Sequence, residues 1–297
     1  MTELSYDRTG FVRAADGTRV FWGLRGEGDR APVVLCDGIG CDGFVWAYLQ
    51  PYLARHRPVL HWHYRGHGRS GPPHDPGTLG IEALAADLWL VCEDAGVSHA
   101  ALLGHSMGVQ VALEALRARP EATLGLGLLC GSAGRITQTF HGTDVLDQWL
   151  PRIVELVERH TGAARALWGR VSPQMAYRIA AAAGEVDGLS IREEDFHHYW
   201  EHVSSMDPDV FLRLLRAAGR HSAEDLLPSI TVPTLVVAAE RDTFTPPELA
   251  RRMADRIPEA IFRVIERGSH AAPVEQPTLV ERWVDDWLEQ VEAAEAT

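Results

Sequence analysis

Residues 101–113 constrain the fold of this chain more than any other stretch. An apolar, strand-like run enters Gly-His-Ser-Met-Gly at 104–108, and an apolar helical pattern leaves it. A G-x-S-x-G sequence between a strand and a helix is typical of a sharp, strained turn with serine at its apex. Glycines two residues before and after Ser106 let the strand and the helix pass close together. An ordinary Gly-Ser turn has the same pattern, so the remaining sequence must decide between the two.

Short apolar runs alternate with helical patterns along most of the 297 residues. This alternation predicts an α/β protein with a mostly parallel central sheet and helices on both faces. An opening hairpin is expected over residues 10–25, and the polar tail at 292–297 is expected to be frayed. Strands are expected at 32–36, 58–64, 101–105, 124–130, 234–239 and 261–265, and helices at 46–54, 78–95, 107–119, 248–256 and 277–291.

Between residues 132 and 227 the alternation stops and only helical patterns remain. We predict a helical cap, or lid, inserted before the last two strands, over the strand ends where α/β proteins bind ligands. The core domain would then comprise residues 1–131 and 228–297. A separate helical domain with no role at the site is the alternative. Aromatic residues gather in this insertion, and three of them are candidate substrate contacts: Trp149, Trp168 and Trp200.

Charge and composition narrow the classes of partner. The net charge of −13 argues against nucleic acid or an anionic membrane surface. The N-terminus has no signal-peptide pattern, and no apolar stretch is long enough to span a membrane. The four cysteines are scattered, so we expect a reduced, cytoplasmic protein.

Histidines are frequent, which raises the question of a metal site. His61 and His63 would share one face of a strand, so a metal site is conceivable there. No carboxylate or cysteine cluster completes such a site, and packed or surface histidines are the favoured interpretation. His197, His198 and His202 also lie near one another without an acidic pattern beside them. We therefore predict no metal ligands.

Three polar residues, Ser106, Asp242 and His270, each follow directly on an apolar strand-like run. The carboxyl ends of parallel strands share one sheet edge, so residues distant in sequence can meet there. Serine needs a base to take its proton, histidine suits that role near neutral pH, and a carboxylate orients the imidazolium. The order Ser, Asp, His is that of nucleophile-elbow hydrolases. We predict a catalytic triad, although singly Asp242 could be a turn residue and His270 a loop histidine. The N–H of Met107, at a helix N-terminus, could donate to an oxyanion.

Four motifs carry a family resemblance: Gly-His-Ser-Met-Gly at 104–108, Arg-Gly-His-Gly-Arg-Ser at 65–70, Arg-Asp at 241–242 with Thr-Pro at 245–246, and Gly-Ser-His at 268–270. With these motifs, over nearly its whole length, the chain resembles α/β-hydrolases of the capped esterase, haloperoxidase-like and C–C hydrolase group. The resemblance implies an α/β-hydrolase fold. It also implies Ser106 as nucleophile, His270 as general base and then acid, and Asp242 as the orienting carboxylate. The oxyanion hole would be the backbone N–H groups of Ile39 and Met107.

One position departs from the pattern of that family. Relatives usually have His-Gly after the first parallel strand, whereas this chain has Asp37-Gly38. The donor at Ile39 is compatible with the change, because an oxyanion hole needs a backbone N–H and not a side chain. An anionic Asp37 would nevertheless oppose a developing oxyanion unless it is turned away or paired. Arg65 and Arg241 are the candidate partners.

These observations predict a carboxylesterase-like serine hydrolase. It would cleave a carboxylic ester or lactone bond of a small, largely apolar substrate through an acyl-enzyme on Ser106. C–C bond hydrolysis or a perhydrolase, haloperoxidase-like activity on the same triad is an alternative. A non-catalytic ligand-binding receptor is another, and only Asp37 favours it. No cofactor is implied, because the glycines at 37–43 lack the spacing of a dinucleotide fingerprint. We expect a small-molecule partner and a monomer or homodimer.

Overall fold

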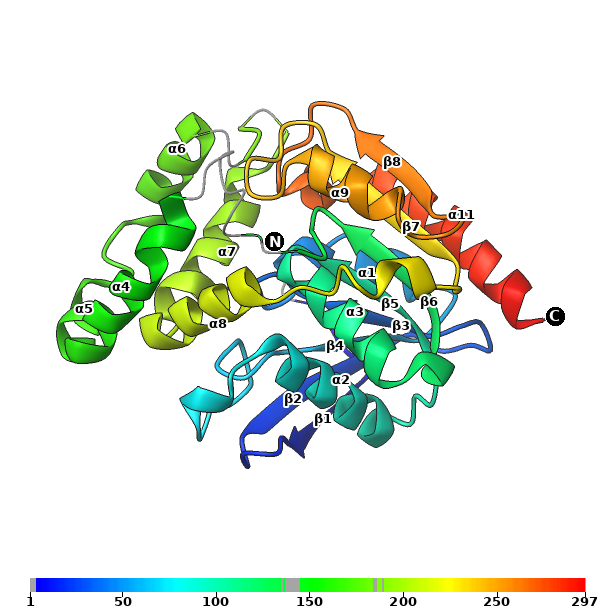
Figure 1. The fold of residues 1–297 in the computed structure, drawn as a ribbon, viewed down its shortest axis with the longest axis horizontal. Coiled ribbons are helices and arrows are strands. Elements are labelled where there is room, and N and C mark those ends of the chain that lie inside the picture. The colour runs from blue at the N-terminus through cyan, green and yellow to red at the C-terminus, as the bar shows by residue number, and fades with distance from the viewer. Residues whose placement is uncertain (1–3, 135, 137–144, 184–185, 189, 297) are drawn as a thin grey trace.

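An eight-stranded sheet in the order β1-β2-β4-β3-β5-β6-β7-β8 runs through the computed structural model (Figure 1). The structure describes residues 4–134, 136, 145–183, 186–188 and 190–296. The strands are β1 (Arg8–Arg13), β2 (Arg19–Arg25), β3 (Val33–Cys36), β4 (Val59–Trp62), β5 (Ala100–His105), β6 (Thr123–Leu129), β7 (Thr234–Ala239) and β8 (Ile261–Ile265). The helices are α1 (Leu49–Leu53), α2 (Ile81–Ala95), α3 (Met107–Ala118), α4 (Val145–Arg159), α5 (Thr161–Leu167), α6 (Pro173–Ala183), α7 (Glu193–Ser205), α8 (Pro208–Arg220), α9 (Pro247–Ala254), α10 (Ala272–Glu275) and α11 (Pro277–Glu295).

Most neighbouring strands of the sheet run parallel to each other. The hairpin β1–β2 is antiparallel, β2 pairs antiparallel with β4, and all pairs from β4 through β8 are parallel. The strands β3, β4, β5 and β7 are buried along their whole length, as the continuous apolar runs predict for strands covered on both faces. The predicted mostly parallel α/β sheet is therefore confirmed.

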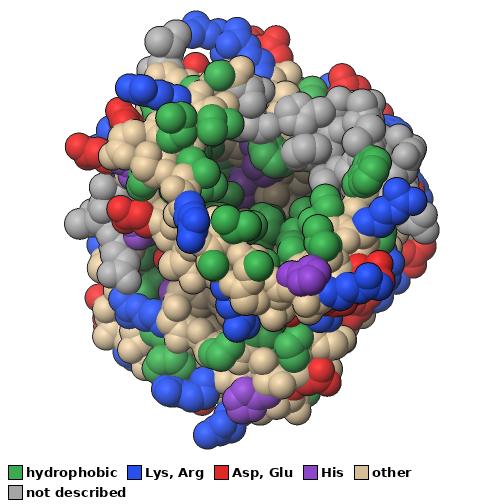
Figure 2. All heavy atoms as spheres, turned by 90° about the vertical axis from the view of Figure 1, so that its left-hand side faces the viewer, with side chains coloured by type: hydrophobic (Ala, Val, Ile, Leu, Met, Phe, Trp, Pro, Cys, Tyr) green, Lys and Arg blue, Asp and Glu red, His purple; other side chains and the backbone are tan. Residues whose placement is uncertain are grey.

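The helices α4 to α8 lie between β6 and β7 in the chain and on one side of the sheet (Figure 1). Their helical character agrees with the periodicity of the sequence, while the division into core and cap domains stays a prediction. Seen from their side, the surface is hollowed, and hydrophobic side chains gather around the hollow (Figure 2). In the described part of the chain, no helix combines the length and apolarity needed to cross a bilayer.

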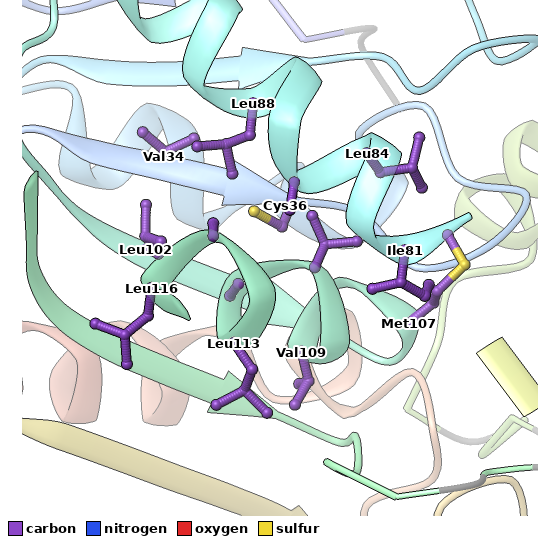
Figure 3. Close-up of a cluster of buried hydrophobic side chains, with 14 of the residues drawn as sticks. Val34, Cys36, Ile81, Leu84, Leu88, Leu102, Met107, Val109, Leu113 and Leu116 are labelled. Carbon is purple, nitrogen blue, oxygen red and sulfur yellow. The ribbon is translucent and has the colours of Figure 1, made fainter. Parts of the chain in front are cut away.

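Two hydrophobic clusters form the core, one on each face of the sheet. Alternate residues of a strand contribute to different clusters, since Val34 and Leu102 belong to one, and Leu35 and Leu103 to the other. Helices α2, α3 and α9 cover the first face, and α1 and α11 cover the second. Figure 3 shows the first face, where side chains of α2 and α3 meet those of β3 and β5. This packing fixes the strand ends that carry the candidate site.

The C-terminal segment differs from expectation. Helix α11 continues to Glu295, so the prediction of a frayed tail at 292–297 is wrong for residues 292–295. The carboxylate of Glu292 accepts hydrogen bonds from Arg57 over 2.6 Å and from Arg30 over 2.8 Å. The Arg57 side chain is only 1% exposed, so Glu292 pairs with a cation that is withdrawn from water. The sequence pattern of α11 alone does not reveal this pairing, because both arginines lie far from it along the chain.

Candidate active site

Ser106 occupies the sharp turn between β5 and α3. Its backbone has φ 56° and ψ −121°, a conformation that a residue with a side chain adopts only under strain. The Ser106 N–H donates to the carbonyl of Leu129 on β6 over 3.1 Å, which ties the turn to the neighbouring strand. The predicted strand, strained turn and helix around Ser106 are therefore present.

The two glycines of the motif are needed because backbones touch. A Cβ on Gly104 would lie 2.3 Å from the carbonyl oxygen of Gly108, so β5 and α3 pass in contact. A Cβ on Gly108 would lie 2.1 Å from the carbonyl oxygen of Cys36, at the end of β3. Any larger residue at either position would push the helix away from the strands. The serine is thus held between three backbone segments.

Asp242 and His270 are brought together by the ends of β7 and β8. His270 Nδ1 lies 2.8 Å from Asp242 Oδ2, and the Asp242 side chain is fully buried. Asp242 Oδ1 accepts the N–H groups of Phe244 and Thr245, and Oδ2 accepts the Thr245 hydroxyl. These three hydrogen bonds hold the Asp242 carboxylate in a fixed orientation. With Asp242 Oδ2 accepting a hydrogen bond from His270 Nδ1–H, Nε2 of the imidazole is left as a proton acceptor.

His105, which the sequence analysis passed over, connects the serine turn to His270. Its Nε2 lies 2.9 Å from the backbone carbonyl oxygen of His270. The centroids of the His105 and His270 imidazole rings are 4.9 Å apart. Because a carbonyl only accepts, His105 carries its proton on Nε2. Burial lowers the pKa of His105 to about 3, so the ring stays neutral near pH 7. The residue directly before Ser106 thus contacts the backbone of His270.

A second contact that the sequence analysis missed holds the loop around His270. The buried carboxylate of Glu275 accepts the N–H and the hydroxyl of Ser269, and the Ser269 hydroxyl accepts the N–H of Ala271. Ser269 therefore has the local turn-stabilising role that such residues commonly have. No sequence motif marked Glu275, because it lies on the one-turn helix α10, which was not predicted.

The loop of residues 37–43 follows β3 and runs beside Ser106. A Cβ on Gly38 would lie 3.1 Å from Ser106 Cβ, and the Gly40 N–H donates to His67 Nε2 over 3.2 Å. Ile39 lies between these two fixed glycines. Met107 is the first residue of α3, where a backbone N–H has no acceptor within the helix. The structure thus places both candidate donors on segments adjacent to the serine.

Asp37 is paired, but not with the expected arginines. Its Oδ2 lies 2.9 Å from His61 Nε2, and both side chains are buried. Arg65 instead forms a two-bond contact with Asp87, and Arg241 is exposed. The prediction of Arg65 or Arg241 as partner is therefore wrong. The register explains the difference, because His61 on β4 is opposite Leu35 on the adjacent strand β3, two residues before Asp37.

The three candidate tryptophans occupy different environments. Trp149 on α4 is 53% exposed, with the Arg152 guanidinium over its ring. The indole N–H groups of Trp168 and Trp200 donate to the backbone carbonyls of Val203 and Val171. Trp168 also packs on Phe211, and a Cβ on Gly40 would meet both Val203 and Phe211. Helices α7 and α8 thus rest on the 37–43 loop through Val203 and Phe211, and substrate contact by the tryptophans stays a prediction.

Histidines of α7 and the core line a separate cavity of about 320 Å³. Asp42 lies 3.6 Å from both His198 and His202, an acidic partner that the local pattern of α7 did not reveal. Within the described residues, no three His, Cys, Asp or Glu side chains are grouped as metal ligands would be. His63 Nδ1 accepts the N–H of Arg69, so its buried Nε2 carries the proton and is not a metal donor.

The chain is similar to known proteins in both sequence and structure. A sequence model of the alpha/beta hydrolase fold matches residues 31–277. The chain is 27% identical over 254 residues to a putative carbamate hydrolase, RutD, of Azorhizobium caulinodans, covering 85% of this chain and 88% of that protein. A thermophilic esterase from Thermogutta terrifontis superposes with a TM-score of 0.77 at 26% identity, covering 96% of this chain and 99% of the other. An enol-lactonase from Burkholderia xenovorans LB400 superposes with a TM-score of 0.75 at 23% identity, covering 94% of this chain and 100% of the other.

Proposed function

Because the chain belongs to the alpha/beta-hydrolase family, we propose that it is a serine hydrolase that cleaves carboxylic ester or lactone bonds. The predicted α/β-hydrolase fold and the family resemblance are both confirmed, and a hydrolase is what the relatives indicate. The observation that carries the proposal is the 2.8 Å hydrogen bond between His270 and Asp242 beside the strained turn at Ser106. Among the described residues, Ser106 is the one serine with a positive φ, and its neighbour His105 contacts His270.

In the proposed reaction, His270 acts first as base and then as acid. Its Nε2 takes the proton of the Ser106 hydroxyl as the serine oxygen attacks the acyl carbon. The same proton then passes to the leaving alcohol, which yields the acyl-enzyme. A water molecule, deprotonated by His270, releases the acid and restores the serine. Asp242, fixed by Thr245, stabilises the imidazolium in both steps.

The N–H groups of Ile39 and Met107 are proposed to bind the oxyanion. Charge develops on the acyl oxygen only in the tetrahedral state, so fixed donors at that position favour the transition state over the substrate. The contact between Gly38 and Ser106 supports this assignment, because it brings the 37–43 loop to the serine. The helix N-terminus at Met107 adds a favourable partial charge.

Helices α7 and α8 are proposed to form the wall for the acyl or alcohol part. Phe211 and Val203 present apolar atoms beside Gly40, which favours an apolar group next to the reacting carbonyl. Ester, lactone and carbamate bonds share an acyl carbon that the same triad can attack. The names of the relatives therefore justify including all three bond types in a substrate panel.

Labelling with a fluorophosphonate probe tests the proposal. Wild-type protein and the Ser98→Ala variant, which changes an exposed serine, should both be labelled, whereas Ser106→Ala should not be. A series of p-nitrophenyl esters, a γ-lactone and a p-nitrophenyl carbamate then defines the bond type. Wild-type protein that takes up no label and turns over none of these compounds would contradict the proposal and favour a ligand-binding receptor.

A further inference from the structure

A buried hydrogen-bonded chain joins Tyr6, His61 and Asp37. His61 Nε2 lies 2.9 Å from Asp37 Oδ2, and His61 Nδ1 lies 2.8 Å from the Tyr6 hydroxyl. The Tyr6 and His61 rings are stacked, with 4° between their planes and 6.1 Å between centroids. The His61 and Asp37 side chains are almost completely buried, and Tyr6 is half-buried, so the His61–Asp37 contact is shielded from solvent. It resembles the His270–Asp242 pair in chemistry, but its histidine lies on β4.

His61 contacts both ends of the 37–43 loop. At the first end it binds the Asp37 carboxylate. At the other end a Cβ on Gly43 would lie 3.1 Å from His61 Cε1, and Gly43 has a φ of 103°. The loop therefore closes around the imidazole, which fixes the separation of its ends. Since Ile39 lies between them, its N–H direction depends on the same ring.

The Asp37 carboxylate depends on His61. Within the described residues, Oδ1 of Asp37 accepts no hydrogen bond, so the carboxylate is held by the hydrogen bond between its Oδ2 and His61. The backbone carbonyl of Asp37 is held separately by the Tyr64 hydroxyl over 2.8 Å. Without the imidazole, a buried carboxylate would have no partner, and it would move toward water or toward the serine. The loop conformation and the position of this charge thus depend on one side chain.

We propose that His61, held by Tyr6, is a positioning residue that sets the 37–43 loop for oxyanion binding and keeps the Asp37 charge turned away from the acyl oxygen. This inference rests on the proposed function for its kinetic consequence. Its structural part, that His61 orders the loop, stands independently of turnover. The departure from His-Gly in the family pattern is then compensated by a histidine on the neighbouring strand β4.

The variants His61→Gln, Asp37→Asn and Tyr6→Phe test the proposal, with His221→Gln as the matched control. His221 also forms a buried pair, 2.9 Å from Glu114, and it lies outside the proposed site. His61→Gln should lower kcat on p-nitrophenyl acetate by about tenfold or more, since loss of a whole oxyanion donor costs about a hundredfold or more. KM should stay within about twofold, and Tyr6→Phe should show a smaller loss of kcat.

A pair of inhibitors separates loop positioning from a general loss of stability. An alkyl trifluoromethyl ketone forms a hemiketal oxyanion on the serine, whereas the matching methyl ketone binds as a neutral ground-state analogue. His61→Gln should weaken the first by the same factor as kcat and leave the second unchanged. Kinetics equal to those of His221→Gln, or a kcat that rises in Asp37→Asn, would overturn the proposal.

Amide hydrogen exchange gives a readout that does not require activity. His61→Gln should speed exchange at residues 38–43 by about tenfold or more while the amides of β5 stay protected. Unchanged exchange in the loop would overturn the inference even in an active enzyme. Fast exchange in a protein whose wild type takes up no fluorophosphonate would support the positioning role and count only against the proposed hydrolase.

Discussion

His105 donates a hydrogen bond from Nε2 to the backbone carbonyl of His270 over 2.9 Å. The residue before the candidate nucleophile therefore sets the position of the candidate base. His105 is the last residue of β5, and His270 follows β8. Because β5 and β8 are not neighbours in the sheet, this bond connects their ends directly. It ties the backbone of His270 to the buried side chain directly before Ser106.

Replacing His105 tests this connection. In His105→Leu the His270 carbonyl loses its donor, which should cost about 1–3 kcal/mol in the free energy of unfolding. We expect kcat on p-nitrophenyl esters to fall about tenfold with little change in KM, because the base is displaced and the pocket is not. Urea unfolding and steady-state kinetics measure both effects. His105→Gln keeps an N–H donor and should recover most of kcat. If His105→Gln is as slow as His105→Leu, the positioning role is contradicted.

The stability of the protein should fall as the pH drops below neutrality. Burial lowers the pKa of His67 from 6.5 to about 3, and its two nitrogens are already assigned, with Nε2 accepting from Gly40. Between pH 6.5 and 3, His67 is therefore protonated in the unfolded chain but stays neutral in the native state. The stabilisation is complete above pH 6.5 and decreases on acidification, by about 1.4 kcal/mol per pH unit for each such histidine.

Urea unfolding between pH 7.5 and 4.5 measures this slope. His67→Gln should remove one histidine's share of it, whereas His74→Gln, at an exposed position, should leave the slope unchanged. Carboxylates such as Asp42, whose pKa is lowered to about 2 by His198 and His202 despite its burial, add their loss only below their ordinary pKa of 3.8. An unfolding free energy that is flat over this range in wild-type protein would contradict the assignment of neutral buried histidines.

Phe211 is expected to matter more for substrate size than Trp149. Phe211 contacts the 37–43 loop beside Gly40, whereas Trp149 is 53% exposed. Phe211→Ala should raise KM for p-nitrophenyl butyrate and octanoate by about tenfold, the equivalent of about 1.4 kcal/mol of lost apolar contact. The acetate ester should be affected less. Trp149→Ala should leave all three KM values within about twofold, and equal effects of the two variants would contradict this placement of the pocket wall.

Glu292 is expected to contribute to stability without affecting turnover. Glu292→Gln would leave the buried Arg57 guanidinium with its bond to the Ala31 carbonyl but without a counter-charge. Breaking a buried pair in this way costs about 3–5 kcal/mol, and the partial exposure of Glu292 should reduce the loss to about 2 kcal/mol. Urea unfolding measures the loss and esterase kinetics provide the control. Glu289→Gln, one turn earlier on α11 and at an exposed position, should be nearly neutral.

The sequence was sufficient for the features that depend on local patterns. Apolar continuity predicted the buried strands β3, β5 and β7, and the glycines around Ser106 predicted the strained turn. Polar residues after β7 and β8 predicted the contact between Asp242 and His270, while the triad with Ser106 stays a prediction. These inferences succeed because each depends on residues that are neighbours in sequence and on one rule of sheet geometry.

The features that the sequence did not predict are pairings across distant segments. His61 is the partner of Asp37 because of the register between β3 and β4, and charge counting favoured arginine instead. Glu275 reaches Ser269 from a one-turn helix with no periodic pattern. Glu292 contacts Arg57, which lies 235 residues away in the sequence. Such contacts depend on how segments pack, which neither propensity nor periodicity encodes.

β6 and β7 pair directly, from Leu126 opposite Thr234 to Leu129 opposite Val237, although α4 to α8 lie between them in the chain. The segment that contains α4–α8 therefore begins and ends at two neighbouring strands of the sheet. Exchanging these helices for others would alter no strand-to-strand bond. A chimaera that carries α4–α8 of a relative is therefore expected to keep the strand register, and its substrate selectivity would test whether these helices shape the pocket.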